Sequence, residues 1–80
     1  MSWFEMLPPP VRLWTVYELY EPLQYVARLS LIDDGGAQDG NAIMASSYLE
    51  TLRTALVQRG VQQCLRPDPN DDPMIVELWL

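Results

Sequence analysis

The sequence predicts an α+β fold: a single small domain in the order β-β-α-β-β, with an antiparallel sheet and one helix packed on one face. Two strand-like runs precede a helical stretch, and two further extended runs follow it. The length of 80 residues is enough for one domain with one hydrophobic core. We expect residues 11–80 to form this domain. Residues 1–10, which end in three consecutive prolines, are expected to form an extended N-terminal segment.

The first two strands are expected to form a hairpin over residues 11–21 and 23–32. Both runs alternate and are rich in β-branched and aromatic residues, and Pro22 separates them as a turn residue would. The odd positions of both runs are the more apolar, so we expect them to share the core face. Residues that face each other across the hairpin must then both have odd numbers or both have even numbers. This requires a loop with an odd number of residues, namely residues 21–23. The predicted core positions are Val11, Leu13, Thr15, Tyr17, Leu19, Leu23, Tyr25, Ala27, Leu29 and Leu31.

An acidic, glycine-rich loop over residues 33–41 is expected to lead into a helix over residues 42–59. Apolar residues recur in the helical stretch at helical spacing, and polar residues lie between them. Asp39 or Asn41 is expected to cap the start of the helix, and Gly60 stands where a C′ glycine belongs. The predicted apolar stripe consists of Ala45, Leu49, Leu52 and Leu56.

The C-terminal part predicts a short strand over residues 61–66, a stiff acidic loop over 67–73 and a final strand over 74–80. Cys64, in the short strand, is expected to be a small buried hydrophobic residue. In the final strand the even positions are expected in the core and the odd positions on the opposite face. The predicted core positions are Met74, Val76, Leu78 and Leu80.

The composition excludes several classes of function. The net charge is −6, and all five basic residues are arginines. This balance argues against a direct nucleic-acid or anionic-membrane partner, both of which need clustered cations. Without histidine or lysine, and with one cysteine, the chain lacks the usual catalytic bases and a zinc ligand set, so we expect no enzyme, metal or cofactor. The single cysteine and the lack of a signal-peptide pattern favour the cytoplasm.

Two surfaces are candidate protein-binding sites. The outer sheet face would expose aromatic and arginine residues of the kind found at interface hot spots; the alternative is that residues 1–10, with Trp3 and Phe4, cover this face. The two acidic loops would steer a basic partner; the alternative is that their aspartates only form solvated turns. The candidate residues of the sheet face are Trp14, Val16, Tyr20, Arg28 and Trp79. Those of the acidic loops are Asp33, Asp34, Asp68, Asp71 and Asp72.

These features together predict a small acidic inhibitor or adaptor that occludes the surface of another protein. A target with a basic, nucleic-acid-binding surface fits the charge best. In composition alone, without any shared motif, the chain is similar to phage anti-CRISPR and other anti-defence proteins. The alternative is a homodimeric structural or accessory protein without catalytic activity, whose outer sheet face pairs with a second copy.

Overall fold

The computed structural model describes residues 11–80 and places five strands in one antiparallel sheet with one helix against it. The predicted α+β class and the single small domain are confirmed, and the observed order β-β-β-α-β-β contains one strand more than predicted. The predicted N-terminal segment, residues 1–10, lies outside the described residues. The elements are β1 (Val11–Leu19), β2 (Gln24–Asp33), β3 (Gly36–Ser46), α1 (Leu49–Gln58), β4 (Cys64–Leu65) and β5 (Ile75–Trp79). Within residues 11–80, no helix has the length and apolar character needed to cross a membrane.

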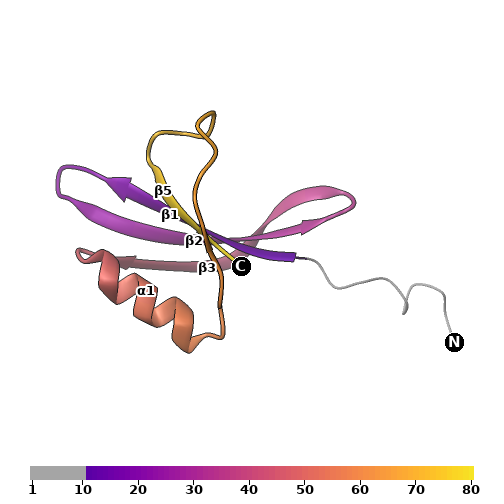
Figure 1. Cartoon of the computed structure of the whole chain (residues 1–80), viewed down its shortest axis with the longest axis horizontal. Coiled ribbons are helices and arrows are strands. Elements are labelled where there is room, and N and C mark those ends of the chain that lie inside the picture. The colour runs from indigo at the N-terminus through magenta and orange to yellow at the C-terminus, as the bar shows by residue number, and fades with distance from the viewer. Residues whose placement is uncertain (1–10) are drawn as a thin grey trace, which may run out of the picture.

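The strand order across the sheet is β3-β2-β1-β5-β4, so β3 and β4 form the two edges. Helix α1 lies below the sheet in Figure 1, and the connection between β4 and β5 rises above it. We call the side of the sheet that packs on α1 the helix face and the opposite side the open face. A single helix cannot cover both faces, so among residues 11–80 no helix packs over the β1, β2 and β3 part of the open face.

The register of the first hairpin differs from the prediction. β1 and β2 are joined by four residues, 20–23, with a cis peptide bond between Glu21 and Pro22. Paired residues therefore have opposite parity, as in Thr15 with Arg28 and Val16 with Ala27. The even positions of β1 and the odd positions of β2 share the helix face, so the core assignment was right within β2 and wrong for most of β1. Thr15 is buried, as predicted, although it lies on the opposite face from α1, and Leu23, predicted as core, is 46% exposed in the loop.

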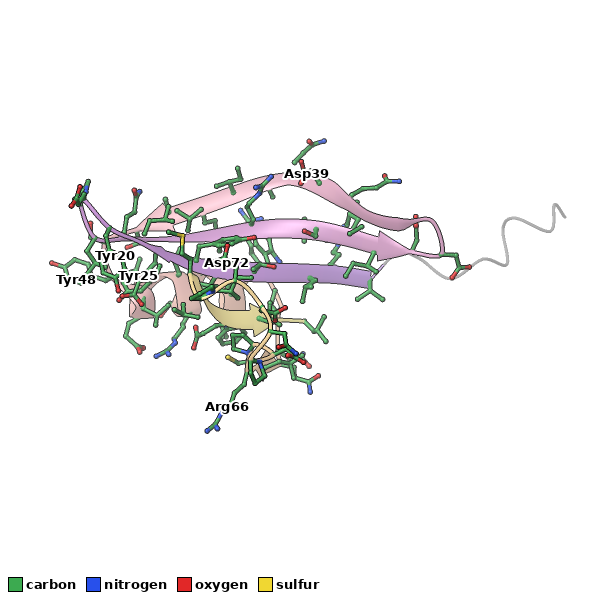
Figure 2. The ribbon with its side chains drawn as sticks, turned by 90° about the horizontal axis from the view of Figure 1, so that it is seen from above. Tyr20, Tyr25, Asp39, Tyr48, Arg66 and Asp72 are labelled. Atoms are coloured by element: carbon green, nitrogen blue, oxygen red, sulfur yellow. The ribbon has the colours of Figure 1, made fainter. Side chains whose placement is uncertain are left out.

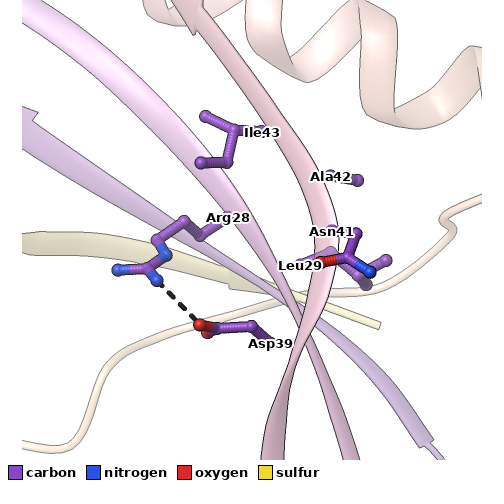
Figure 3. A pocket seen from close by; sticks show the side chains of 6 residues that line it. All are labelled: Arg28, Leu29, Asp39, Asn41, Ala42 and Ile43. Atoms are coloured by element: carbon purple, nitrogen blue, oxygen red, sulfur yellow. Dashed lines mark hydrogen bonds and ion pairs between the residues drawn. The ribbon is translucent and has the colours of Figure 1, made fainter.

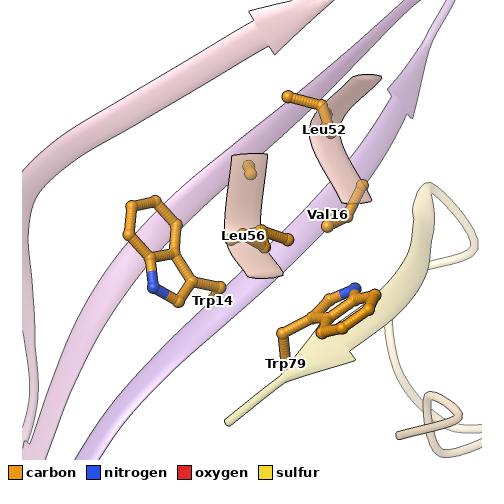
Figure 4. Close-up of a cluster of buried hydrophobic side chains, with 6 residues drawn as sticks. Trp14, Val16, Leu52, Leu56 and Trp79 are labelled. Atoms are coloured by element: carbon orange, nitrogen blue, oxygen red, sulfur yellow. The ribbon is translucent and has the colours of Figure 1, made fainter. Parts of the chain in front are cut away.

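The two indoles predicted for an outer face instead form the core. Trp14 is 4% exposed and Trp79 is 8% exposed, and Val16 is completely buried. Figure 4 shows the two indole rings on either side of Leu56, which α1 inserts between them. Each indole buries on the order of 200 Å² of largely apolar surface, so packing both rings under the helix removes a large apolar area from water and stabilises the fold.

The C-terminal part of the final strand is inverted relative to the prediction. Trp14 pairs with Trp79 and Val16 with Glu77, which brings Glu77 and Trp79 to the helix face. A bulge follows between Val16 and Tyr17, and Val76 packs against the core as predicted. Two of the positions predicted as core, Met74 and Leu80, are 48% and 40% exposed. This short strand has apolar residues on both of its sides, so the alternation of apolar and polar residues does not show which side is buried.

Residues 36–46 form strand β3 rather than an acidic loop and the first turns of a helix. Ala42, Met44 and Ser46 are half-buried, whereas Ile43 and Ala45 are exposed, which is the period of two expected for a strand. Alanine and methionine are good helix formers, but helix propensity is a weak determinant, and pairing along β2 overrides it. The helix begins at Leu49, after Tyr48 as N-cap, so the predicted capping by Asp39 or Asn41 was wrong.

The predicted apolar stripe of the helix is confirmed for Leu49, Leu52 and Leu56 and wrong for Ala45, which is exposed in β3. Leu52 and Leu56 are 2% and 0% exposed and pack into the core, with Leu49 against them. Gly60 has φ +88°, the left-handed conformation expected for a glycine directly after a helix.

A bulge in β3 shapes the sheet edge next to the site described below. Between the pairs Arg28–Ile43 and Ser30–Asp39, three residues of β3 lie opposite Leu29 alone. Asn41 has φ +58°, and the backbone of Gly40 passes close to the Leu29 side chain. A Cβ atom on residue 40 would lie 2.6 Å from Leu29 Cγ, which is well inside van der Waals contact.

We therefore expect Gly40→Ala to lower the free energy of unfolding by about 1–3 kcal/mol, because the leucine must leave its rotamer or the bulge must move. Urea denaturation measures this change. Gly36→Ala is not a suitable control because Gly36 has φ +109°. Ala37→Ser, an exposed change on the same strand, should stay within about 0.5 kcal/mol. Equal stability of Gly40→Ala and the wild type would contradict the close packing of the bulge.

Candidate protein-binding site

A shallow apolar hollow lies on the open face, across β1, β2 and β3. Its volume is about 470 Å³, and it is formed mainly by apolar side chains on the positions that point away from α1. Ile43 is 66% exposed, a large value for an apolar side chain in a strand. We call this feature the open-face hollow; it is lined by Tyr17, Leu19, Val26, Arg28 and Ile43.

A second hollow of about 350 Å³ adjoins the first at the bulge of β3 and shares Arg28 and Ile43 with it. Figure 3 shows the Arg28 guanidinium pointing toward the Asp39 carboxylate. The Arg28 Nη2 and Asp39 Oδ1 atoms are 3.2 Å apart, and both side chains remain largely exposed. A surface ion pair of this kind adds little stability, so both groups remain available to a partner.

The acidic loop over residues 67–73 lies on the same side of the sheet as the open face. In Figure 1 it stands on the opposite side of the sheet from α1. Its end is attached to β1, because the Glu18 backbone N–H donates to the Met74 carbonyl oxygen at 2.8 Å. Figure 2, which looks down on this side, shows Asp39 along one border of the sheet and Asp72 toward the other. Carboxylates therefore flank the apolar surface on two sides.

The aspartates of this loop also hold its shape. Asp68 Oδ1 accepts a hydrogen bond from the Asn70 backbone N–H at 2.8 Å, and Asp71 Oδ2 accepts one from the Asp68 N–H at 2.9 Å. Asp72 Oδ1 accepts one from the Met74 N–H at 2.9 Å. Each carboxylate uses one oxygen in a turn and leaves the other to solvent. The predicted turn-forming role of these aspartates is therefore confirmed, and it leaves their charge exposed on the surface.

The structure places the predicted sheet-face residues in three different environments. Trp14, Val16 and Trp79 lie in the core and cannot contact a partner, so their assignment as binding residues was wrong. The cause is the four-residue loop between β1 and β2, because its length turns each β1 side chain to the face opposite the predicted one. Arg28 lies on the open face and lines both hollows. Tyr20 is 68% exposed but lies in the β1–β2 turn outside the open-face hollow.

The two groups of acidic residues do not gather at one place. Asp33 and Asp34 are at the β2–β3 turn, where Asp33 Oδ1 accepts a hydrogen bond from the Gly35 N–H at 2.8 Å. Asp68, Asp71 and Asp72 are all exposed in the β4–β5 connection. Only this second group stands beside the apolar part of the open face.

The sequence did not identify four residues of the hollow. Tyr17 and Leu19 were assigned to the core because they occupy odd positions of β1. Val26 is on the open face as expected for an even position of β2, but it was not singled out as a binding residue. Ile43 was assigned to a helix that does not begin until Leu49. The sequence signal that would have placed Ile43 on a strand is the alternation of side chains with a period of two over residues 42–46.

Three tyrosines lie at the turn end of the sheet; Tyr20 and Tyr48 are exposed, and Tyr25 packs partly against the core. Figure 2 shows Tyr20, Tyr25 and Tyr48 at the same end of the molecule. Tyr48 is 73% exposed. The Tyr20 hydroxyl donates a hydrogen bond to Glu18 Oε1, and this bond and the charge of Glu18 raise the pKa of the Tyr20 phenol above its usual value.

A polar cluster joins helix α1 to strand β5. Arg53 of α1 donates to the Glu77 carboxylate of β5, with Arg53 Nη2 2.7 Å from Glu77 Oε2, and it also pairs with Glu50. Trp79 Nε1–H donates to Glu77 Oε1 at 3.3 Å. Burial alone would raise the pKa of Glu77, but the hydrogen bonds from Arg53 and Trp79 outweigh it and lower that pKa. The hydrogen bonds that Arg53 donates to Glu77 and Glu50 raise the pKa of Arg53 despite its partial burial.

Cys64 belongs to the same cluster and was wrongly expected to be buried. It is exposed, and its Sγ atom is 3.7 Å from Glu77 Oε2. Partial desolvation and the negative charge of Glu77 raise the pKa of the Cys64 thiol. A raised thiol pKa disfavours the reactive thiolate.

The lowered pKa of Glu77 predicts a pH dependence of stability. Because the carboxylate is more acidic in the folded state, its stabilising contribution is complete above its unfolded pKa of about 4.3 and is lost as the pH falls through its folded pKa. We expect Glu77→Gln to be less stable than the wild type at pH 7 and to lose less stability on acidification below about pH 4.5. Thermal unfolding from pH 7 to pH 2.5 measures both. Parallel losses in the two proteins would contradict the assignment.

Comparison with protein-family models, with curated proteins and with solved structures finds no match for the chain. Among residues 11–80, no group of three or more histidine, cysteine, aspartate or glutamate side chains is arranged to hold a metal ion. The interpretation of the site therefore follows from its geometry and charge.

Proposed function

We propose that the chain is a small protein-binding inhibitor or adaptor without catalytic activity, which covers a basic surface of a target protein. The observation that carries this proposal is the apolar open face bordered by carboxylates. Its hollow is lined by four apolar or aromatic side chains and one arginine, and the loop with Asp68, Asp71 and Asp72 stands on the same side. Large apolar patches with a polar rim are typical of protein-interaction sites.

The chemistry of the site favours a partner that presents cationic side chains around an apolar anchor. An apolar side chain of the partner would fill the open-face hollow, against Tyr17 and Ile43. Lysine or arginine residues around it would face the acidic loop on one side and Asp39 on the other. Opposite charges across an interface accelerate association and select the partner.

A protein surface that binds nucleic acid carries this kind of positive charge. If such a surface is covered by an acidic domain, its nucleic-acid ligand is excluded by volume and by charge. Inhibition by occlusion needs no catalytic group, and an anti-defence role such as that of anti-CRISPR proteins would be one use of this activity.

The test compares charge variants of the acidic loop. The wild-type chain is immobilised, a cell extract is passed over it at low salt, and the captured protein is identified and purified. We expect Asp71→Asn combined with Asp72→Asn to slow association with this protein by about tenfold at low salt and to reduce the salt dependence. Surface plasmon resonance measures both. Asparagine keeps a carbonyl oxygen for the turn hydrogen bonds, so the loop is retained.

The matched control removes two carboxylates that lie away from the open face. Glu21→Gln combined with Glu50→Gln changes the net charge equally, and both residues are exposed. If both double variants slow association equally, net charge and not the acidic loop steers the partner, and the proposed site is wrong. If the chain captures no protein and light scattering shows a dimer at tens of micromolar, the homodimeric alternative replaces the proposal.

A further inference from the structure

A third cavity, of about 420 Å³, lies on the helix side of the molecule and is separate from the open face. It is formed where the N-terminal half of β1 meets the segment that follows α1. Its volume falls within the range of about 300–1,000 Å³ that is usual for small-molecule sites. Its polar groups are Arg12 and Arg59, and its apolar lining comes from Trp14, Leu29, Val61 and Leu80.

The cavity is cationic in an otherwise acidic protein. No aspartate or glutamate lines it, whereas two of the five arginines do. Within residues 11–80, ion pairs are formed by Arg28 and Arg53, but not by Arg12 or Arg59. No acidic side chain of the described residues therefore competes with a ligand for either guanidinium.

The main-chain groups at the cavity have hydrogen-bond partners of their own. The main-chain oxygen of Leu80 accepts hydrogen bonds from the Gln62 and Gln63 backbone N–H groups, each at 3.1 Å. At the end of α1, backbone N–H groups of residues 59–61 donate to the last carbonyl oxygens of the helix.

The Arg59 guanidinium is held in position before any ligand arrives. Its Cζ atom lies 5.5 Å from the centroid of the Trp14 ring, which is a cation–π geometry. Trp14 is 4% exposed and packed in the core, so the ring is a rigid support. A prearranged guanidinium loses little freedom on binding, and its planar fork matches the two oxygens of a carboxylate or a phosphate.

We propose that this cavity binds a small organic oxyanion, a carboxylate or a phosphate ester, whose charged group lies between Arg12 and Arg59. The body of the ligand packs against the apolar lining. This site is on the other side of the sheet from the open-face hollow, and it does not depend on the protein-binding function proposed above.

The test follows the indole N–H signal of Trp14 in the ¹⁵N-labelled full chain by NMR. The probes are benzoate, phenyl phosphate and the neutral analogue benzamide. We expect saturable shifts with benzoate or phenyl phosphate at a Kd of about 1 mM or below, and none with benzamide. The probe with the lower Kd identifies carboxylate or phosphate as the preferred group.

Arginine variants assign the binding to the cavity. Arg12→Gln and Arg59→Gln should each raise the Kd by about tenfold or more, because each removes a charge-assisted hydrogen bond. Arg66→Gln changes the net charge equally at an exposed arginine outside the cavity and should leave the Kd within about twofold. Arg59→Lys, which keeps the charge, should bind more weakly than the wild type and more tightly than Arg59→Gln.

Three outcomes would overturn the proposal: no saturable shift with either anion, equal binding of benzamide, or equal weakening by Arg66→Gln. Thermal unfolding of each variant verifies that it is folded. Ile43→Asp, on the open face, should leave anion binding unchanged, which separates this test from that of the protein-binding site.

Discussion

Replacement of Leu56 by alanine is expected to lower the free energy of unfolding by about 2–5 kcal/mol, one of the two largest effects predicted for this chain. Leu56 is fully buried, and Figure 4 shows it between the two indole rings of Trp14 and Trp79. Its removal leaves a cavity between rigid rings that cannot collapse to fill it. A domain of this size has a total stability of only about 5–15 kcal/mol, so urea denaturation should show a clearly lower midpoint.

The neighbouring residue provides a matched control. Val57 is 59% exposed on the outer side of the same helix, and Val57→Ala should change the stability by less than about 0.5 kcal/mol. If Leu56→Ala cost no more than Val57→Ala, the indole-lined core under the helix would be wrong.

Ile43→Asp is expected to weaken binding of the captured target by about 100-fold while the fold is retained. Ile43 lines both hollows of the open face and is 66% exposed, so the isolated protein loses little packing when this side chain is replaced. In the complex, however, the new carboxylate would be buried in an apolar contact, and loss of a hot-spot residue costs about 2 kcal/mol or more. Isothermal titration calorimetry measures the affinity.

Val57→Asp is the control for this prediction, because it introduces the same charge at a similarly exposed apolar residue on the helix side. It should bind the target within about threefold of the wild type. Equal weakening by both substitutions would show that the added charge, and not the open face, determines the affinity.

The sequence was sufficient for the fold class because several local signals agreed. Alternation in residues 11–19 and 24–33, helical spacing at Leu49, Leu52 and Leu56, and the glycine at position 60 each matched the structure. Each of these signals involves residues that are close together in the sequence, so it can be read from a single sequence.

The sequence was not sufficient for deciding which strand face is buried. β1 is apolar on both sides, with Trp14 and Val16 on one side and Leu13 and Tyr17 on the other. The alternation of residues therefore could not show which side of β1 is buried. The decision then depended on the length of the β1–β2 loop, and a change from three residues to four moved every β1 side chain to the other face.

The same ambiguity hid the candidate site. Its residues come from three strands that meet only through long-range pairing, and Ile43 joins them only because residues 36–46 pair with β2. The acidic loop over residues 67–73 was found because it depends on composition alone, whereas most of the loop predicted over residues 33–41 is strand β3. The position of the loop over residues 67–73 relative to the apolar surface follows from the sheet topology, which the sequence left open.

The most direct test of the account places a photoreactive amino acid on either side of the sheet. One variant carries p-benzoylphenylalanine at position 43 on the open face, and the other carries it at position 57 on the outer side of α1. After irradiation with the captured target, we expect a covalent complex from position 43 and little or none from position 57. Cross-linking from position 57 alone would contradict the open face as the binding surface.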